Sequence, residues 1–262
     1  RKPVPTIEAR EGAAGFRHPE KPLLILCGAI ASETQAVLAA SGLSDAGEIT
    51  ALPAIWHNFP ERIPDGVEAK AVQARKDRAD RPVFVGYADC GTGGLLDSWI
   101  ETTPREVQRL PGAHCYSFLT GSDEFDRLHS AELGSFFLTD FLALHFDALV
   151  WAGLGLDRHP ELRDMYFAAY TRVVLLTQDG SPEVRRAAES AAERLSLPLE
   201  VVETGREHLR ERLDVEGLHH RAAVAEDVAP ERVDDAVPRS PRHRSVDRRL
   251  ADTVSAVVDQ WL

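Results

Sequence analysis

Leu23-Leu24-Ile25-Leu26-Cys27-Gly28 is the stretch of sequence that decides the fold. Five apolar residues in a row are typical of a strand that is buried on both faces, as in a parallel sheet. Gly28 marks a tight turn after this strand. The following Ser32-Glu33-Thr34-Gln35 fits a capping box, which indicates a helix that ends near residues 41–42. The segment is therefore predicted to be a strand, a glycine turn and a helix.

The same alternation of strands and helices continues along the chain. Further strands are expected at residues 49–52, 82–87, 114–119, 148–151, 172–177 and 199–202. Helices are expected at residues 64–79, from 95, from 123, at 160–170 and at 181–195. Residues 135–145 have a helix-like pattern, although 136–138 also fit a strand. The sequence therefore predicts an α/β fold, a three-layer, mostly parallel, Rossmann-like sheet with helices on both faces, followed by a C-terminal helical extension.

The chain divides into three regions by composition. Residues 1–21 are a polar leader, and residues 22–204 form the α/β domain, in which 22–118 and 148–203 are candidates for two pseudo-equivalent halves. Residues 205–262 are a charged linker and then an amphipathic helix with one apolar face, made of Val246, Leu250, Val254, Val257, Val258 and Trp261. This helix is expected to pack on its own domain, with docking to a partner or a second subunit as the alternative.

Composition and charge limit the classes of function. The chain has 262 residues, 44% of them hydrophobic, and a formal net charge of −12. This acidic balance disfavours binding to nucleic acid or to anionic membranes. The sequence holds no apolar stretch long enough for a transmembrane helix. Its three widely spaced cysteines make a poor disulfide framework, so we expect free thiols in the cytoplasm.

The three cysteines are candidate metal ligands. Cys27 ends a predicted strand, Cys90 follows another, and Cys115 lies at the start of a third, with His114 beside it as a candidate fourth ligand. Ligands in parallel sheets bind beyond the carboxyl ends of the strands, where such residues can converge. Three thiolates can hold zinc with one open position, or a [4Fe-4S] cluster with one open iron. The alternative is that each cysteine is a small buried apolar residue.

Polar residues in the neighbouring loops are candidates for catalysis and substrate binding. His57, Asp89 and His159 are candidate proton carriers. The run Asp89-Cys90-Gly91-Thr92-Gly93-Gly94 lies between a strand and a helix, so Gly91, Thr92, Gly93 and Gly94 are expected to bind a carboxylate or phosphate of the substrate. Glu33 and Asp157 are further candidates for substrate contact, although helix-dipole stabilisation explains Glu33 equally well. No GxSxG elbow and no nucleotide fingerprint is present.

Several motifs together resemble one family. They are Cys27-Gly28-Ala29-Ile30, His57-Asn58-x-Pro60-Glu61, Asp89-Cys90-Gly91-Thr92-Gly93-Gly94-Leu95, Gly112-x-His114-Cys115-Tyr116, Thr139-Asp140-Phe141-Leu142, and Gly155-Leu156-Asp157-Arg158-His159-Pro160-Glu161-Leu162-Arg163-Asp164-Met165-Tyr166. Over about residues 22–204 the chain resembles the domain-of-unknown-function family number 1638. The resemblance adds Tyr166 as a candidate substrate contact and implies an association with corrinoid- and folate-dependent methyl transfer. All three cysteines lie inside these motifs, which strengthens the expectation of a shared metal site.

Three functions follow from these features. The first is a zinc enzyme that activates a small polar metabolite, bearing a thiol or carboxylate, for methyl transfer in one-carbon metabolism. The second is an iron–sulfur lyase or dehydratase that uses the same three cysteines. The third is a non-catalytic, metal- or cofactor-handling accessory protein. A corrinoid protein or a methyltransferase is the expected partner, and a homo-oligomer is an open alternative.

Overall fold

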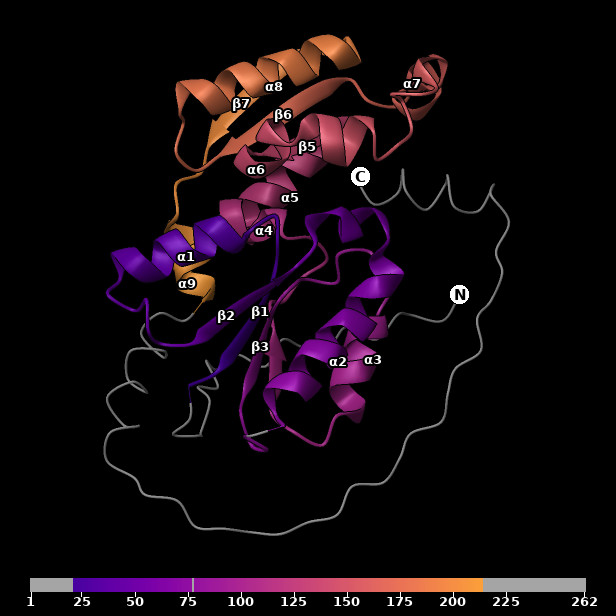
Figure 1. Cartoon of the computed structure of the whole chain (residues 1–262). Helices are drawn as coiled ribbons and strands as arrows, with labels where there is room; N and C mark the ends of the chain where they lie inside the picture. Colours follow the sequence, from indigo (N-terminus) through magenta and orange to yellow (C-terminus); the bar gives the residue numbers. More distant parts are fainter. Residues whose placement is uncertain (1–20, 77, 214–262) are drawn as a thin grey trace, which may run out of the picture.

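The computed structural model describes residues 21–76 and 78–213, and the strands within these residues form two parallel sheets (Figure 1). The first sheet has the order β2-β1-β3-β4, with bounds β1 (Leu23–Cys27), β2 (Glu48–Leu52), β3 (Val83–Gly86) and β4 (Val107–Arg109). The second has the order β5-β6-β7, with bounds β5 (Ser135–Thr139), β6 (Arg172–Thr177) and β7 (Leu199–Glu203). The α/β prediction is confirmed, and its parallel strands are divided between two sheets instead of forming one.

Helices connect successive strands, as parallel pairing requires. The α-helices are α1 (Ala31–Ala40), α2 (Ile63–Ala74), α3 (Leu95–Thr102), α4 (Tyr116–Thr120), α5 (Ser122–Ala131), α6 (Asp140–Leu144), α7 (Arg163–Tyr166), α8 (Pro182–Leu195) and α9 (Glu207–Arg212). Shorter helices are η1 (Ala54–Asn58), η2 (Pro60–Arg62), the π-helix η3 (Asp147–Trp151) and η4 (Pro160–Leu162). The predicted leader and the amphipathic C-terminal helix lie outside the described residues.

The first sheet is covered on both faces. Every residue of β1 is buried, and its side chains alternate between two apolar clusters. Ile25 belongs to the large core that includes residues of α2, whereas Leu24 and Leu26 pack in a second cluster with Leu38 of α1. Figure 1 shows α2 and α3 on one side of this sheet and α1 on the other. The prediction of a strand buried on both faces is confirmed for β1.

The second sheet also has apolar side chains on both faces. Phe137 of β5 contacts the rings of Tyr116 and Phe125, at centroid distances of 5.6 and 5.2 Å, and so faces α4 and α5. The preceding residue, Phe136, contacts Phe167 from the opposite face. The helices α4 and α5 follow the first sheet and precede the second, so they carry the chain from one sheet to the other.

Two local predictions were wrong, each where an apolar run was short. Residues 114–119 are a loop and α4, because the strand beside β3 is the polar, half-buried segment Val107–Arg109, which carries no apolar signal. Residues 148–151 belong to the π-helix η3, in which only Val150 is fully buried. For residues 135–145 the strand alternative is confirmed by β5, and the helix α6 follows it. Periodicity cannot distinguish strand from helix in runs of this length.

The predicted helix caps had different outcomes. Ser181 caps α8 through its side chain, which accepts a hydrogen bond from Val184 N. The capping box at residues 32–35 does not form, since α1 already begins at Ala31 and the Ser32 hydroxyl donates to Glu33 instead. A cap motif therefore located both helices, but it placed the start correctly only for α8.

The strand order creates a topological switch point in the first sheet. From β1 the chain moves to β2 on one side and then crosses to β3 on the other. In parallel sheets, ligands bind in the crevice that such a reversal leaves outside the carboxyl ends of the two central strands. The strands β5, β6 and β7 follow one another in order, so the described part of the second sheet has no such reversal. No helix in residues 21–76 and 78–213 is long and apolar enough to cross a membrane.

Replacing Ile25 with alanine tests how much the core of the first sheet contributes to the stability of the fold. Ile25 is fully buried in the central strand, so Ile25→Ala is expected to lower the free energy of unfolding by about 2–5 kcal/mol. Urea denaturation measures this loss. Val72→Ala on the exposed face of α2 is the control, with a change within about 0.5 kcal/mol. Equal effects at the two positions would contradict the assigned core.

Candidate functional site

The three cysteines converge at the switch point of the first sheet. Cys27 is the last residue of β1, Cys90 lies in the loop that follows β3, and Cys115 caps α4. All three are buried, with 4 to 6% of their surface exposed. They are free thiols. Cys27 and Cys90 are 63 positions apart along the chain, and Cys90 and Cys115 are 25 positions apart. The fold thus brings all three to one edge of one sheet.

Interactions among the thiols show how closely they are placed. The Cys115 thiol hydrogen-bonds to Cys90, and this bond lowers the pKa of Cys90 while it raises the pKa of Cys115 well above its usual range. Burial, followed by the charge of Cys90, raises the pKa of Cys27 to about 12. The burial of three thiols side by side therefore makes Cys90 the most acidic of the three.

The backbone of Cys90 is held in an unusual conformation. Its φ is +47°, in the left-handed region that a residue with a Cβ seldom adopts. Hydrogen bonds from Asp89 N to Gly112 O and from Cys90 N to Ala113 O fix the loop beside the segment that carries Cys115. A glycine would adopt this conformation without strain, as Gly91, Gly93 and Gly94 do in the same loop. A cysteine kept at a strained position is an indication that its side chain is functional.

Tyr87 is a buried polar residue that the sequence analysis missed. The register pairs Leu26 with Gly86, so Tyr87 follows β3 next to Cys27. Its hydroxyl lies beside the Cys27 thiol, yet it has no hydrogen-bond partner of full geometry among the described residues. Burial is the main cause that raises the pKa of Tyr87 far above its usual range. The neutral phenol therefore adds a polar group to the thiol cluster.

The glycine turn after β3 holds a carboxylate from its own chain. The Asp89 carboxylate accepts hydrogen bonds from Thr92 Oγ1 (2.7 Å), Gly94 N (2.8 Å) and Gly93 N (3.1 Å). Partial burial would raise the pKa of Asp89, but these bonds and the charge of Arg109 outweigh it and lower the pKa. Asp89 thus orders the turn as a carboxylate. Two of the amides that we expected to bind a substrate anion, those of Gly93 and Gly94, donate to this internal carboxylate.

Two histidines lie near the thiols. Burial and the neighbouring His114 lower the pKa of His57 from 6.5 to about 4, so its imidazole is neutral at pH 7. Burial is also the main cause that lowers the pKa of His114, which packs against the rings of Tyr116 and Phe125. Neutral imidazoles accept protons or bind metals, so both histidines are suited to the roles that the sequence indicated.

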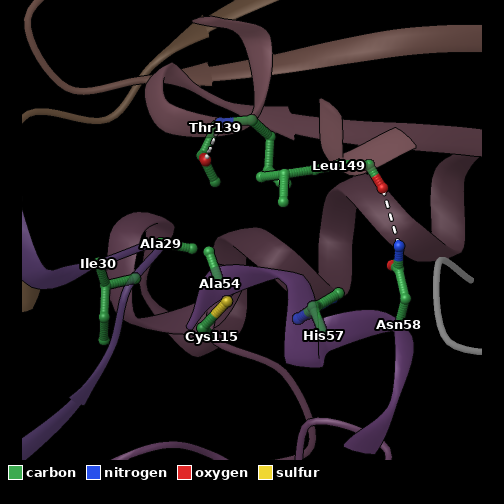
Figure 2. A pocket seen from close by; sticks show the side chains of 9 residues that line it. Ala29, Ile30, Ala54, His57, Asn58, Cys115, Thr139 and Leu149 are labelled. Atoms are coloured by element: carbon green, nitrogen blue, oxygen red, sulfur yellow. Dashed lines mark hydrogen bonds between the residues drawn. The ribbon is translucent and has the colours of Figure 1, made fainter. Parts of the chain in front are cut away.

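An enclosed apolar cavity lies beside Cys115, between the first and second sheets (Figure 2). Its volume is about 10 Å³. The first-sheet side supplies Ala29, Ile30, Ala54, His57, Asn58 and Cys115, and the second-sheet side supplies Thr139, Leu142 and Leu149. Asn58 Nδ2 donates a 2.9 Å hydrogen bond across the cavity edge to Leu149 O, and Figure 2 shows this bond. The cavity is thus formed jointly by the loops after β1 and β2 and by the segments after β5.

Of the four other candidate residues, three have local partners. Glu33 accepts from Ser32, Asp157 pairs with Arg158 at 3.8 Å, and His159 pairs with Glu161 at 3.2 Å. Tyr166 is half-buried on α7, which lies at the outer end of the second sheet in Figure 1. None of these pairings connects the four residues to the cysteines, so their predicted roles stay predictions.

The described residues contain no set of three or more His, Cys, Asp or Glu side chains already placed to hold a metal ion. The thiol cluster supplies the donor atoms in one place without their being arranged around a common centre. Binding of an ion would therefore require its ligands to adjust.

A family model described as a protein of unknown function, DUF1638, matches residues 51–213. The chain belongs to the DUF1638 family. The match includes Cys90, Cys115 and His57 and begins beyond Cys27, so it starts later and ends later than the resemblance over residues 22–204 that we expected. No curated protein and no solved structure matches the chain. Membership in DUF1638 names no activity.

The lowered pKa of His57 predicts a pH dependence of stability. As the pH falls below 6.5, His57 takes up a proton in the unfolded chain before it does so in the folded one. The stabilisation is therefore present above pH 6.5 and is lost as the pH falls towards 4. At about 1.4 kcal/mol per pKa unit the loss has an upper bound of about 3.5 kcal/mol, and it is smaller than this because the side chain keeps partial exposure to solvent.

Urea denaturation of wild type and of His57→Gln at pH 7 and pH 4.5 measures this contribution. The variant is expected to lose less stability than wild type over this range, because glutamine does not titrate. His159→Gln, at an exposed position, is the control and should behave as wild type does. An unchanged pH slope in His57→Gln would contradict the assigned environment of His57.

Proposed function

We propose that this DUF1638 protein is a metal-dependent enzyme in which Cys27, Cys90 and Cys115 bind one zinc ion, and that it activates a substrate thiol for methyl transfer. The observation that carries the proposal is the convergence of all three cysteines of the chain at one switch point. Switch points of parallel sheets are where such folds bind their ligands. Cysteines that served only as small buried apolar residues would not need to cluster at this point of the sheet.

The donor atoms fit zinc. Thiolates are the ligands that zinc, among the common biological cations, accepts most readily, and three of them leave one tetrahedral position for a substrate. The thiol contact between Cys90 and Cys115 favours one shared ion over a four-iron cluster, because in a cluster each thiolate binds a different iron. The strained backbone at Cys90 and the partly satisfied hydroxyl of Tyr87 are further signs that the cluster is incomplete as it stands.

The bound ion would lower the pKa of a thiol in its open position and so make a nucleophile at neutral pH. The chain's own residues complete the reaction. The neutral imidazole of His57, beside Cys115 in the cavity lining, is suited to accept the thiol proton. The substrate sulfur then forms a bond to the methyl carbon, and the bond from that carbon to a corrinoid or folate donor breaks with the electron pair leaving on the donor.

The proposed setting follows from the same residues. Three free cysteines fit the reducing cytoplasm, where thiols stay reduced. A partner that delivers the methyl group, either a corrinoid protein or another methyltransferase, is part of this proposal.

Metal analysis of anaerobically purified full-length protein tests the proposal. We expect one zinc per chain and no colour. Cys27→Ser, Cys90→Ser and Cys115→Ser should each weaken zinc binding by more than about 100-fold, because loss of a ligand exceeds the usual effect of changing a residue behind one. Competition with a chromophoric chelator measures these affinities.

Val174→Ala is the matched control, since it removes buried volume from β6 without removing a sulfur atom. It should keep the zinc affinity of wild type. Brown protein that contains iron and sulfide would indicate an iron–sulfur cluster in place of zinc. It would favour a lyase reaction over methyl transfer. Folded protein that binds neither metal would refute the shared site.

A further inference from the structure

Two of the three clustered cysteines, Cys90 and Cys115, are in direct contact. Their side chains share a hydrogen bond, and both are free thiols. The backbone holds this contact in place, because Cys90 N donates a 2.8 Å hydrogen bond to Ala113 O, just before Cys115 in the chain. Two thiols in contact need only lose their hydrogen atoms and approach to a bond length of about 2 Å to form a disulfide.

Cys27 lies beside this pair and has a different neighbour. It is the last residue of β1, where its position is fixed by pairing with Leu52 of β2. The group beside its thiol is the Tyr87 hydroxyl. A phenol cannot complete a disulfide, and a shift of Cys27 towards another sulfur atom would disturb the pairing of the central strand. The geometry therefore divides the three cysteines into a pair and a single residue.

The pair lies at the rim of the core, beneath exposed backbone. The thiols themselves are buried, with 4 and 6% of their surface exposed, whereas Gly91 and Ala113 beside them in the chain are exposed. Cys90 stands in the loop after β3 and Cys115 at the start of α4, so neither lies in the middle of a packed strand. This position suits reaction with a small, neutral oxidant such as hydrogen peroxide.

We propose that Cys90 and Cys115 are a redox modification site, which a hydroperoxide converts to a reversible disulfide while Cys27 stays a free thiol. In the zinc enzyme this disulfide removes two of the three ligands and so switches the metal site off. That consequence rests on the proposed function, whereas the disulfide itself requires no zinc.

The oxidation proceeds in two steps that balance. The sulfur of one thiol attacks an oxygen of hydrogen peroxide, the O–O bond breaks, and the other oxygen leaves as water with the thiol proton. The product is a sulfenic acid. The sulfur of the second thiol then attacks the first sulfur, and the S–O bond breaks with its electron pair on oxygen, which takes the second thiol proton and leaves as water. The two thiols together lose two electrons, and one peroxide is reduced to two molecules of water.

Peptide mapping of the oxidised full-length protein tests the proposal. Reduced protein is freed of metal with a chelator, treated with hydrogen peroxide, alkylated at its remaining thiols and digested with trypsin. The three cysteines fall in different tryptic peptides, 18–62, 79–105 and 110–127. We expect the second and third peptides to be joined and the first to be alkylated. A phosphine reductant should restore all three thiols.

The chain unfolded in urea is the control for distance along the sequence. Loop closure alone favours a disulfide between Cys90 and Cys115 over one between Cys27 and Cys90 by about fourfold, because the first pair is closer in the chain. We expect this ratio to be at least about tenfold higher in the folded protein, where the contact is already formed. Cys27→Ala should form the same disulfide as wild type.

Three results would overturn the proposal. They are a ratio that folding leaves unchanged, oxidation to sulfinic acid without a disulfide, and three thiols that all resist peroxide. A disulfide that contains Cys27 as the main product of the folded protein would do so as well.

Zinc release separates this proposal from the zinc proposal. In zinc-loaded protein, peroxide should release the ion to a chromophoric chelator in step with the disulfide, and the phosphine should reverse both changes. The mapped disulfide in a protein that binds no zinc would support the redox pair and refute the metal site. Zinc binding by a protein whose metal-free form makes no disulfide between Cys90 and Cys115 would support the metal site and refute the redox pair.

Discussion

The position of β1 between β2 and β3 is the constraint on which the site depends. Because the chain adds β2 on one side of β1 and β3 on the other, the connections after β1 and β3 run to opposite sides and leave room between them at the carboxyl ends of these strands. Cys27 stands at one side of this gap and Cys90 at the other. Cys115 reaches the gap because residues 112–113 accept hydrogen bonds from the backbone of residues 89–90. Without this topology the three thiols would lie at unrelated places in the core.

The two sheets meet at this same place. The segments after β5 close the cavity from the second sheet's side, and the Asn58 bond to Leu149 ties η1 to η3 across it. Gly153 packs against both ends of this bond, since a Cβ there would lie 2.1 Å from Leu149 O and 2.4 Å from Asn58 Nδ2. The contact between the sheets is therefore tight at this point.

Residues at the ends of regular elements were the most predictable from sequence. The buried run of β1, the serine cap of α8 and the thiols at the ends of β1 and β3 follow from local patterns that the structure keeps. The glycine turn was located correctly, but the carboxylate that fills it is Asp89, because a carboxylate five residues before a free amide can fold back onto it. The sequence pattern alone does not show whether such a turn binds a carboxylate of the same chain or an anionic group of a ligand.

Residues whose role depends on the tertiary contact between the sheets could not be predicted. The strand β4 is polar and short, so the strand expected at 114–119 was assigned to the more apolar segment next to it. Asn58 and Tyr87 are ordinary polar residues in sequence. Their significance arises only from burial without a full set of partners, which is a property of packing between segments far apart along the chain.

X-ray absorption at the zinc edge tests the central claim, a single ion held by three converging thiolates, most directly. For the full-length protein loaded with one equivalent of zinc, the account predicts three sulfur neighbours at about 2.3 Å and one lighter neighbour. A zinc ion surrounded only by nitrogen and oxygen atoms would contradict it, because the cysteines at the switch point would then take no part in binding the metal.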